Sequence, residues 1–273
     1  MVYEKAYAKL NLLLDVVGKR EDGYHQLKTI MIPLELHDEL TFLDSDSDVV
    51  ESSIIIPNNV ILKTILWVKQ AYQIDRFVRV QLKKNIPIGS GLGGGSANVA
   101  ATLRGLNQLW DMKLSQTELE KAALALGSDT LFCLYNESAL IQGRGEHLTF
   151  IEKPPIESIT LLIPPVEVST KTIFSQFKNS SQSMKFEKVF QFYKNGDWAS
   201  FFKHTYNQLL PTTLETYPEL KKWYKKLQKV YPNIQMSGSG SAFYLINNQN
   251  KKTILLKKWE KTGLKVVETC INS

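Results

Sequence analysis

The chain contains 273 residues, of which 43% are hydrophobic, 10% aromatic and 22% charged. These fractions are typical of a folded protein and exclude a disordered chain. Its 2 cysteines exclude a disulfide framework and a four-cysteine zinc site. The N-terminal residues lack the apolar stretch of a signal peptide, and no run approaches the roughly 18–20 apolar residues of a membrane span. We therefore expect a soluble, cytoplasmic protein with no membrane partner.

The net charge of +6 is distributed unevenly, because residues 156–273 carry +9 and residues 1–155 carry −3. Much of the excess lies in five lysines whose spacing places them on one face of a helix. They are Lys221, Lys222, Lys225, Lys226 and Lys229. A solvated helix face is a better explanation than a site for a polyanion, so we expect no nucleic-acid partner.

Helix and strand patterns alternate through residues 1–155. Asn59 is a suitable N-cap for the apolar-rich stretch 60–72, which predicts a helix. Residues 78–83 alternate between apolar and polar side chains, as in a strand with one face toward water. A glycine-rich turn follows, and the spacing of apolar residues within 96–110 predicts another helix.

The next helix is indicated at both of its ends. Ser115 and Glu118 have the spacing of a capping box, and Gly127 is placed to end the helix that follows. Beyond residue 158 the pattern predicts a strand, several helices, a turn of small residues, a strand over 242–246, and a final helix and strand. The expected architecture is α+β.

The stretch EKPPIES at 152–158 is the best candidate for a domain boundary. Its two prolines would break any continuing helix or strand. We therefore expect two domains, formed by residues 1–155 and 156–273.

Residues 87–98 read PIGSGLGGGSAN, so that five of the 15 glycines lie between Gly89 and Gly95. Glycines allow positive φ angles and let backbone amides approach a ligand closely. The helix that follows presents unpaired N–H groups and a partial positive charge at its start. This combination favours a phosphate site over a tight turn with no ligand.

Two common phosphate sites fit the turn poorly. Gly89, Gly91 and Gly94 satisfy the dinucleotide fingerprint GxGxxG, but that pattern alone is weak. A dinucleotide fold also needs an acidic residue at the end of the next strand, and Asp111 follows a helix instead. A P-loop is excluded because no Gly-Lys-Ser/Thr closes the turn.

The sequence PIGSGLGGGSA at 87–97 resembles the nucleotide loop of the GHMP kinases, which phosphorylate small alcohols such as homoserine, galactose and mevalonate. AKLNLLLDVVGKREDGYHQLKTI at 8–30 is similar to the members of that family whose acceptor is 4-diphosphocytidyl-2-C-methyl-D-erythritol. Further segments follow in the order and spacing of that branch, namely NNVILKT at 58–64, LGSDTLFCL at 126–134, GRGE at 143–146 and MSGSGSAFYLI at 236–246.

The resemblance implies a two-lobed GHMP kinase fold. Its N-terminal, ATP-binding lobe would resemble domain 2 of ribosomal protein S5, and its C-terminal, substrate-side lobe would be ferredoxin-like. It also implies ATP-dependent phosphorylation of the acceptor's 2-hydroxyl in the methylerythritol phosphate route to isoprenoid precursors. The cofactors would be ATP and Mg²⁺, the partner a small molecule, and the protein a monomer or a weak homodimer.

The family uses a lysine and an aspartate in catalysis, and these map onto Lys9 and Asp129. An ammonium beside a carboxylate keeps the carboxylate ionised and able to accept a proton. Without the resemblance, Asp129 would be interpreted as a helix N-cap. Ser96 is expected near the phosphates or Mg²⁺. The ATP-binding residues implied are Pro87, Ile88, Gly89, Ser90, Gly91, Leu92, Gly93, Gly94, Gly95, Ser96 and Ala97.

One segment departs from the family pattern. The family has valine and proline after the aspartate, where this chain has Thr130 and Leu131. The resemblance therefore keeps the role of Asp129 but leaves the geometry of its loop open.

The acceptor carries a cytidine diphosphate, so its site must recognise a pyrimidine. Tyr24 can stack on the base and His25 can form hydrogen bonds with its edge. The resemblance places Phe174 on the other side of the base and Thr170 in a polar contact. It places Asn11 on the substrate, and Gly238 and Ser239 near its methylerythritol and phosphate end.

The other histidines, His37, His147 and His204, lack the spacing of metal ligands, so we expect no metal site made by a side-chain cluster. Two alternatives stay open from the sequence. The first is another GHMP kinase with a different acceptor. The second, suggested by the altered Thr130–Leu131 loop, is a catalytically silent nucleotide-binding relative.

Overall fold

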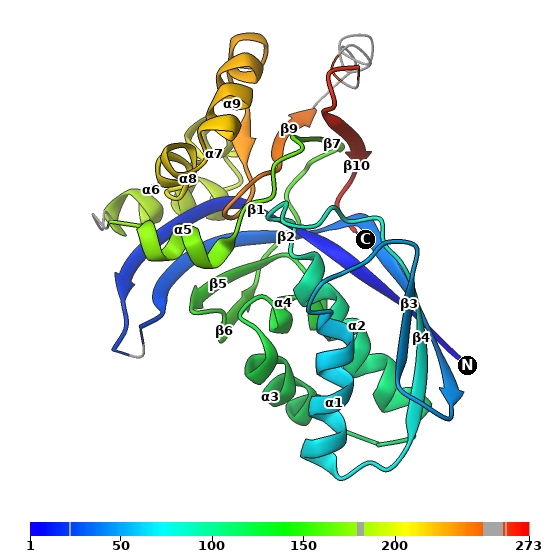
Figure 1. Cartoon of the computed structure of the whole chain (residues 1–273). Coiled ribbons are helices and arrows are strands. Elements are labelled where there is room, and N and C mark those ends of the chain that lie inside the picture. Colours follow the sequence, from blue (N-terminus) through cyan, green and yellow to red (C-terminus); the bar gives the residue numbers. More distant parts are fainter. Residues whose placement is uncertain (22, 179–182, 248–258, 260, 273) are drawn as a thin grey trace. The chain divides into compact units, whose positions relative to one another are not determined.

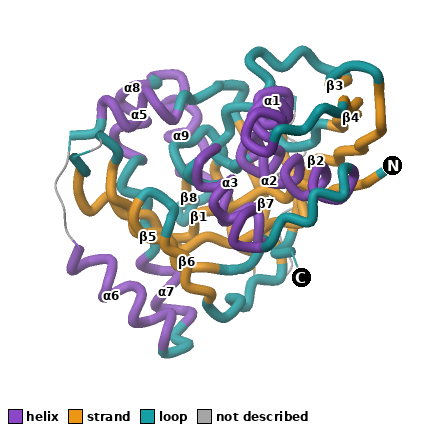
Figure 2. The backbone as a smooth tube through the Cα atoms, turned by 90° about the horizontal axis from the view of Figure 1, so that it is seen from below, coloured by secondary structure: helices purple, strands orange, loops and turns teal. Residues whose placement is uncertain are grey.

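The computed structural model describes residues 1–21, 23–178, 183–247, 259 and 261–272 (Figure 1). Figure 2 shows the same chain with helices and strands in separate colours. The strands are β1 (Val2–Lys19), β2 (His25–Ser45), β3 (Val49–Ser52), β4 (Phe77–Lys83), β5 (Ala139–Gly143), β6 (His147–Phe150), β7 (Ser158–Ile163), β8 (Gln235–Met236), β9 (Phe243–Asn247) and β10 (Lys265–Thr269). The helices are α1 (Val60–Tyr72), α2 (Gly94–Leu109), α3 (Gln116–Leu126), α4 (Thr130–Tyr135), α5 (Thr170–Gln176), α6 (Ser183–Lys194), α7 (Trp198–His204), α8 (Leu210–Thr216) and α9 (Pro218–Val230).

The chain forms two compact units, each made of segments that are discontinuous in sequence. The first unit comprises Met1–Lys9, Leu36–Pro87 and Gly93–Asn136, and the second comprises Leu10–Glu35, Ile88–Leu92 and Glu137–Ser273. The long strands β1 and β2 contribute residues to both units. The domain boundary between residues 155 and 156 stays a prediction.

The first unit contains the first part of β1, the last part of β2, the strands β3 and β4, and the helices α1, α2, α3 and α4. Residues 39–45 of β2 pair antiparallel with β4, and β3 runs parallel to β4. The side chains of β4 alternate between exposed and buried, which confirms the predicted strand with one wet face. Helix α2 packs against α1, α3 and α4, and Figure 2 shows α1, α2 and α3 next to one another. Gly105 of α2 lies against the ring of Phe42, where a Cβ atom would overlap the ring.

The helix boundaries in this unit follow the capping signals in the sequence. Asn59 accepts a hydrogen bond from Ile61 N through its side chain at the start of α1. Ser115 and Glu118 form both bonds of a capping box at the start of α3, and Gly127 ends that helix. These three predictions are confirmed.

In the second unit, residues 27–31 of β2 pair antiparallel with β5, which in turn pairs with β6. A separate antiparallel sheet has the strand order β10-β7-β9-β8. Strand β9 confirms the prediction over 242–246, and β10 is the expected last strand. The helix expected between them lies outside the described residues.

Helix α9 shows why its lysines gather on one face. Leu220 and Leu227 are buried in the core of the second unit, together with Tyr231 just after the helix. The five lysines of the predicted basic face are all exposed, as expected for a solvated face. Among the described residues, no helix is long and apolar enough to cross a bilayer.

Candidate active site

The glycine-rich loop has the backbone geometry that its composition predicts. Gly89, Gly91 and Gly93 have φ angles of +63°, +73° and +71°, which residues with a Cβ rarely adopt. Helix α2 begins directly after Gly93, which has no side chain to cap the first N–H groups of the helix. These N–H groups and the positive end of the helix are suited to hold an anion.

Within the second unit, residues 88–92 of the loop are held against the turn of small residues at 237–241. Ala242 N donates to Ser90 O over 2.9 Å, and Ser237 Oγ donates to Gly91 O over 3.1 Å. A Cβ on Gly91 would collide with the carbonyl oxygen of Ser237 and would lie 2.8 Å from Gly240 O. The two turns, almost 150 residues apart in the sequence, thus form one backbone-to-backbone contact that only glycine permits.

The predicted catalytic pair is brought together in the first unit. Lys9 Nζ lies 3.5 Å from Asp129 Oδ2, and the Lys9 side chain is almost fully buried. Lys9 also runs along Gly93, because a Cβ on that glycine would lie 2.6 Å from Lys9 Cγ. The ammonium and the carboxylate therefore stand next to the start of α2, where the loop presents its N–H groups.

Asp129 occupies the N-cap position of α4, but its side chain makes no capping hydrogen bond. The carboxylate is instead engaged by Lys9 and is about one third exposed. Thr130 and Leu131, which replace the valine and proline of the family pattern, are buried in the first turn of α4. Thr130 N donates to Gly127 O over 3.2 Å, so the loop closes into a helix without the proline.

Cys133 follows one turn later in α4 and is buried. Burial, with a smaller contribution from the negative charge of Asp129, raises the pKa of the Cys133 thiol to about 12. This thiol is therefore not a nucleophile at neutral pH.

In the second unit, His25 lies between aromatic rings. Its ring centroid is 5.3 Å from that of Phe174 and 5.9 Å from that of Phe177. Burial, and then the positive charge of Lys19, lowers the pKa of the His25 imidazole, so the ring is neutral at neutral pH. A neutral imidazole can donate from one nitrogen and accept at the other, which suits the edge of a base.

Tyr24 is half exposed, with the Arg144 guanidinium 5.0 Å from its ring centroid. Sequence analysis did not single out Phe177, which lies beside His25, or Arg144, which lies beside Tyr24. In the sequence, Arg144 was noted only as part of the GRGE segment at 143–146.

The remaining predicted substrate residues make polar contacts with one another or with nearby groups. Thr170 Oγ1 lies 2.8 Å from Ser239 Oγ, and Thr213 Oγ1 donates to Ser239 O. Thr170 begins α5, and Phe174 stands one helical turn further along the same face. Helix α5 therefore connects the aromatic cluster around His25 to the turn that contains Ser239.

Asn11 is buried and donates through Nδ2 to Thr29 Oγ1 over 2.8 Å. Its backbone N–H faces Ser237 Oγ at 3.4 Å. Gly238 O accepts a hydrogen bond from Asn207 Nδ2 over 2.7 Å. Sequence reasoning missed Thr29 and Asn207, because their partners lie far away in the chain.

Within the described part of the chain, no group of three or more histidine, cysteine and acidic side chains is arranged to hold a metal ion. Ser96 lies near Gly127, two residues before Asp129, since a Cβ on that glycine would lie 3.8 Å from Ser96 Oγ. Mg²⁺ prefers oxygen ligands and commonly takes only one or two from a protein when phosphates supply others. The Ser96 hydroxyl is an oxygen donor of this kind, so its chemistry fits a magnesium ion that would arrive with a nucleotide.

Comparison with known proteins agrees with this geometry. Residues 59–137 match the model of the GHMP kinases N terminal domain. A 4-diphosphocytidyl-2-C-methyl-D-erythritol kinase from Listeria innocua is 36% identical over 252 residues, which cover 89% of this chain and 87% of the relative. The chain belongs to the 4-diphosphocytidyl-2-C-methyl-D-erythritol kinase family.

Solved structures confirm the predicted α+β, two-lobed GHMP kinase fold. The crystal structure of a 4-(cytidine 5'-diphospho)-2C-methyl-D-erythritol kinase matches with a TM-score of 0.78 and 26% identity, over 100% of both chains. Streptococcus pneumoniae phosphomevalonate kinase, solved with phosphomevalonate and AMPPNP, matches with a TM-score of 0.70 and 14% identity, over 100% of both chains. The second likeness concerns the fold alone.

Proposed function

We propose that this chain transfers the γ-phosphoryl group of ATP to the 2-hydroxyl of 4-diphosphocytidyl-2-C-methyl-D-erythritol, in the methylerythritol phosphate route to isoprenoid precursors. The observation that carries the proposal is the Lys9–Asp129 pair beside Gly93, in a chain of this kinase family. Phosphoryl transfer to an alcohol requires a group that accepts the hydroxyl proton and positive charge near the transferred group.

The triphosphate of ATP would lie on the glycine-rich loop, residues 87–97. The N–H groups at the start of α2 and the partial positive charge of the helix would hold its oxygens. The positive φ angles at Gly89, Gly91 and Gly93 support this role, because they allow the backbone itself to contact the phosphates.

In the reaction, Asp129 accepts the proton of the 2-hydroxyl while that oxygen forms a bond to the γ-phosphorus. The bond between the γ-phosphorus and the bridging oxygen breaks, and ADP leaves with the bonding electrons. Lys9 offsets charge on the transferred group. Most of the catalysis lies in positioning and charge neutralisation, as in other phosphoryl transfers.

Mg²⁺ would be held by Ser96 together with the phosphates, and when bound it neutralises phosphate charge. Lys9 is a fixed, nearly buried charge, whereas Asp129 is exposed enough to reach a ligand.

The cytosine of the acceptor would stack between the rings of Tyr24 and Phe174, with the neutral His25 on its edge. Asn11 and the pair of Thr170 and Ser239 would contact the rest of the acceptor, with Gly238 beside them. The Arg144 guanidinium would hold the Tyr24 ring in place through a cation–π contact.

We also propose that the protein works in the cytoplasm as a monomer or weak homodimer, with a small molecule rather than a nucleic acid as its partner. The five lysines of the basic face of α9 are all exposed, which supports the last point because it is typical of a solvated helix face.

A panel of acceptors tests the proposal. The purified chain is given ATP and Mg²⁺ with the cytidyl acceptor, mevalonate, phosphomevalonate or homoserine in turn, and ADP release is followed by a coupled assay. Of these four acceptors, only the cytidyl acceptor is expected to be turned over. Turnover of another alcohol in its place would show a different acceptor, and nucleotide binding without turnover of any would show a catalytically silent relative.

A further inference from the structure

One buried carboxylate, which belongs to none of the residues discussed above, holds the segment that leads into the glycine-rich loop. Asp38 lies in β2, is fully buried, and accepts four hydrogen bonds. Its Oδ1 accepts from the backbone N–H groups of Asn85 and Ile86, each over 2.8 Å. Its Oδ2 accepts from Lys84 Nζ over 2.6 Å and from Asn98 Nδ2 over 2.9 Å.

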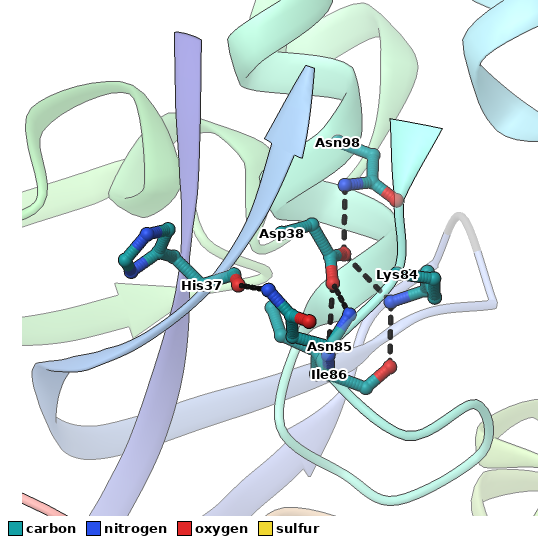
Figure 3. Close-up of polar contacts among 6 residues, drawn as sticks. All are labelled: His37, Asp38, Lys84, Asn85, Ile86 and Asn98. Atoms are coloured by element: carbon teal, nitrogen blue, oxygen red, sulfur yellow. Dashed lines mark hydrogen bonds and ion pairs between the residues drawn. The ribbon is translucent and has the colours of Figure 1, made fainter. Parts of the chain in front are cut away.

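The four donors come from the two segments that flank the loop (Figure 3). Lys84, Asn85 and Ile86 form the approach, which starts where β4 ends and leads into the loop at Pro87. Asn98 stands in the second turn of α2, just beyond the loop, and is buried. One carboxylate therefore fixes the approach and the helix relative to each other.

Lys84 extends this arrangement to the first residue of α2. Its ammonium also donates to Ile86 O over 2.6 Å, so the approach is folded around it. A Cβ on Gly94 would lie 3.1 Å from Lys84 Nζ and 3.0 Å from the side chain of Ile86. The start of the helix that would bind phosphate is thus packed directly on the group that Asp38 holds.

A buried ion pair is a poor way to gain stability, because removing two charges from water offsets most of their attraction. Its geometric demands are strict, however, since every donor must meet the carboxylate at the correct angle. Both carboxylate oxygens of Asp38 already accept two hydrogen bonds each, so the group is suited to orient its neighbours.

We infer that Asp38 is a positioning residue for ATP: through Lys84 and Asn98 it sets the orientation of the loop and of the first turn of α2. This inference deepens the proposed function and rests on it. The consequence is specific, since loss of the Asp38 contacts should weaken nucleotide binding and leave the cytidine end of the acceptor site unaffected.

Asp38→Asn is the sharpest test of this role. The carbonyl oxygen of the new amide can still accept from Asn85 N and Ile86 N, but its NH₂ group then faces two donors, Lys84 Nζ and Asn98 Nδ2. We expect the Kd for AMPPNP, measured by calorimetry, and the KM for ATP to rise about 10- to 100-fold, as for a misplacement of about 1 Å. The Kd for CDP should stay within about twofold of the wild-type value.

Two further variants keep the test decisive if Asp38→Asn folds poorly. Asn98→Ala leaves the Asp38–Lys84 pair intact and removes only the tie to α2, so it should raise the Kd for AMPPNP about 3- to 10-fold. In the double variant Asp38→Asn with Asn98→Asp, the new amide donates and the new carboxylate accepts. This reversal removes one of the two contacts between donors, so the double variant should bind AMPPNP more tightly than Asp38→Asn alone.

Asp48→Asn is the matched control, because Asp48 pairs with Lys69 over 2.7 Å and accepts from Val78 N in the same unit. This variant should lower the melting temperature without changing the Kd for AMPPNP. Unchanged AMPPNP affinity in folded Asp38→Asn or Asn98→Ala, or an equal loss in Asp48→Asn, would overturn the inference. Wild-type protein that binds AMPPNP but does not turn over the cytidyl acceptor would overturn the proposed function instead.

Discussion

The Lys9 side chain runs along the α-carbon of Gly93 with no room between them, since a Cβ on Gly93 would lie 2.6 Å from Lys9 Cγ and 3.2 Å from its Cε. Gly93 also has a φ of +71°, so both its conformation and its neighbour require glycine. The proposed catalytic lysine is thus positioned by the last residue before α2.

Gly93→Ala should therefore displace Lys9 and strain the backbone. We expect a loss of roughly 1–3 kcal/mol in the free energy of unfolding and a fall in kcat of about 10-fold or more. Urea denaturation and steady-state kinetics measure the two effects. Gly95→Ala is the comparison for stability, because Gly95 is helical and has no atom near its Cβ position. If Gly93→Ala is as stable as Gly95→Ala, the contact with Lys9 does not constrain the loop.

Asp129→Asn retains the shape of the side chain and removes the proton acceptor. If Asp129 is the base, kcat should fall by about 10²–10⁴ while the KM values for both substrates stay near those of the wild type. Because phosphoryl transfer needs little help in removing the proton, the low end of this range is expected. A variant with normal kcat and raised KM would show that Asp129 binds substrate and does not act as a base.

Thr130→Val is the matched control for Asp129→Asn. The Thr130 hydroxyl is buried and has no hydrogen-bond partner among the described residues, so valine removes an unsatisfied group at equal volume. The free energy of unfolding should stay the same or rise by up to about 1 kcal/mol, with kcat within about twofold of wild type. If Thr130→Val loses activity, the Thr130 hydroxyl is instead needed for the function of the loop that carries Asp129.

Tyr24→Ala should separate binding from chemistry. Loss of one stacking partner is worth roughly 1–3 kcal/mol, so the KM for the cytidyl acceptor should rise about 5- to 150-fold at nearly constant kcat. ATP affinity should stay within about twofold of wild type. Tyr24→Phe keeps the ring and should behave like the wild type. Turnover that is abolished at saturating acceptor would contradict a role limited to holding the base.

His25 makes stability depend on pH in a predictable direction. The folded state has a lower His25 pKa than the ordinary value of about 6.5. The unfolded chain therefore takes up a proton first as the pH falls, which lowers the free energy of unfolding below about pH 6.5. In urea denaturation at several pH values, the wild type should lose more stability than His25→Gln between about pH 7 and pH 5.5. If the free energy of unfolding falls equally in the wild type and in His25→Gln over this pH range, His25 does not contribute to the pH dependence.

Local signals in the sequence predicted much of the fold. The cap at Asn59 and the capping box at Ser115 involve residues two or three positions apart, and alternation in 78–83 reports which face of one strand is wet. Such features depend on neighbouring residues alone, so they can be inferred without tertiary structure. The glycine-rich turn belongs to the same class, because its composition already requires unusual φ angles.

The contacts that complete the site were not predictable in this way. Asp38 is 46 residues from Lys84 and 60 from Asn98, and no spacing rule relates them. The contact of Ser237 with Gly91 and the ring of Phe177 beside His25 likewise depend on the folded chain. The resemblance to a family supplied Lys9 and Asp129, whereas their 3.5 Å separation and the close contact of Lys9 with Gly93 required the structure.

Because Cys133 is buried, the rate at which its thiol is labelled measures local unfolding of α4. Only a thiolate reacts readily with a disulfide reagent, and a buried thiol with a pKa of about 12 reacts only when α4 opens. Cys270 is exposed and should be modified at once, so the slow second phase of labelling belongs to Cys133. The rate of that phase measures how often the segment that carries Asp129 unfolds locally. Bound substrates that hold Asp129 should slow it, without any engineered label in the chain.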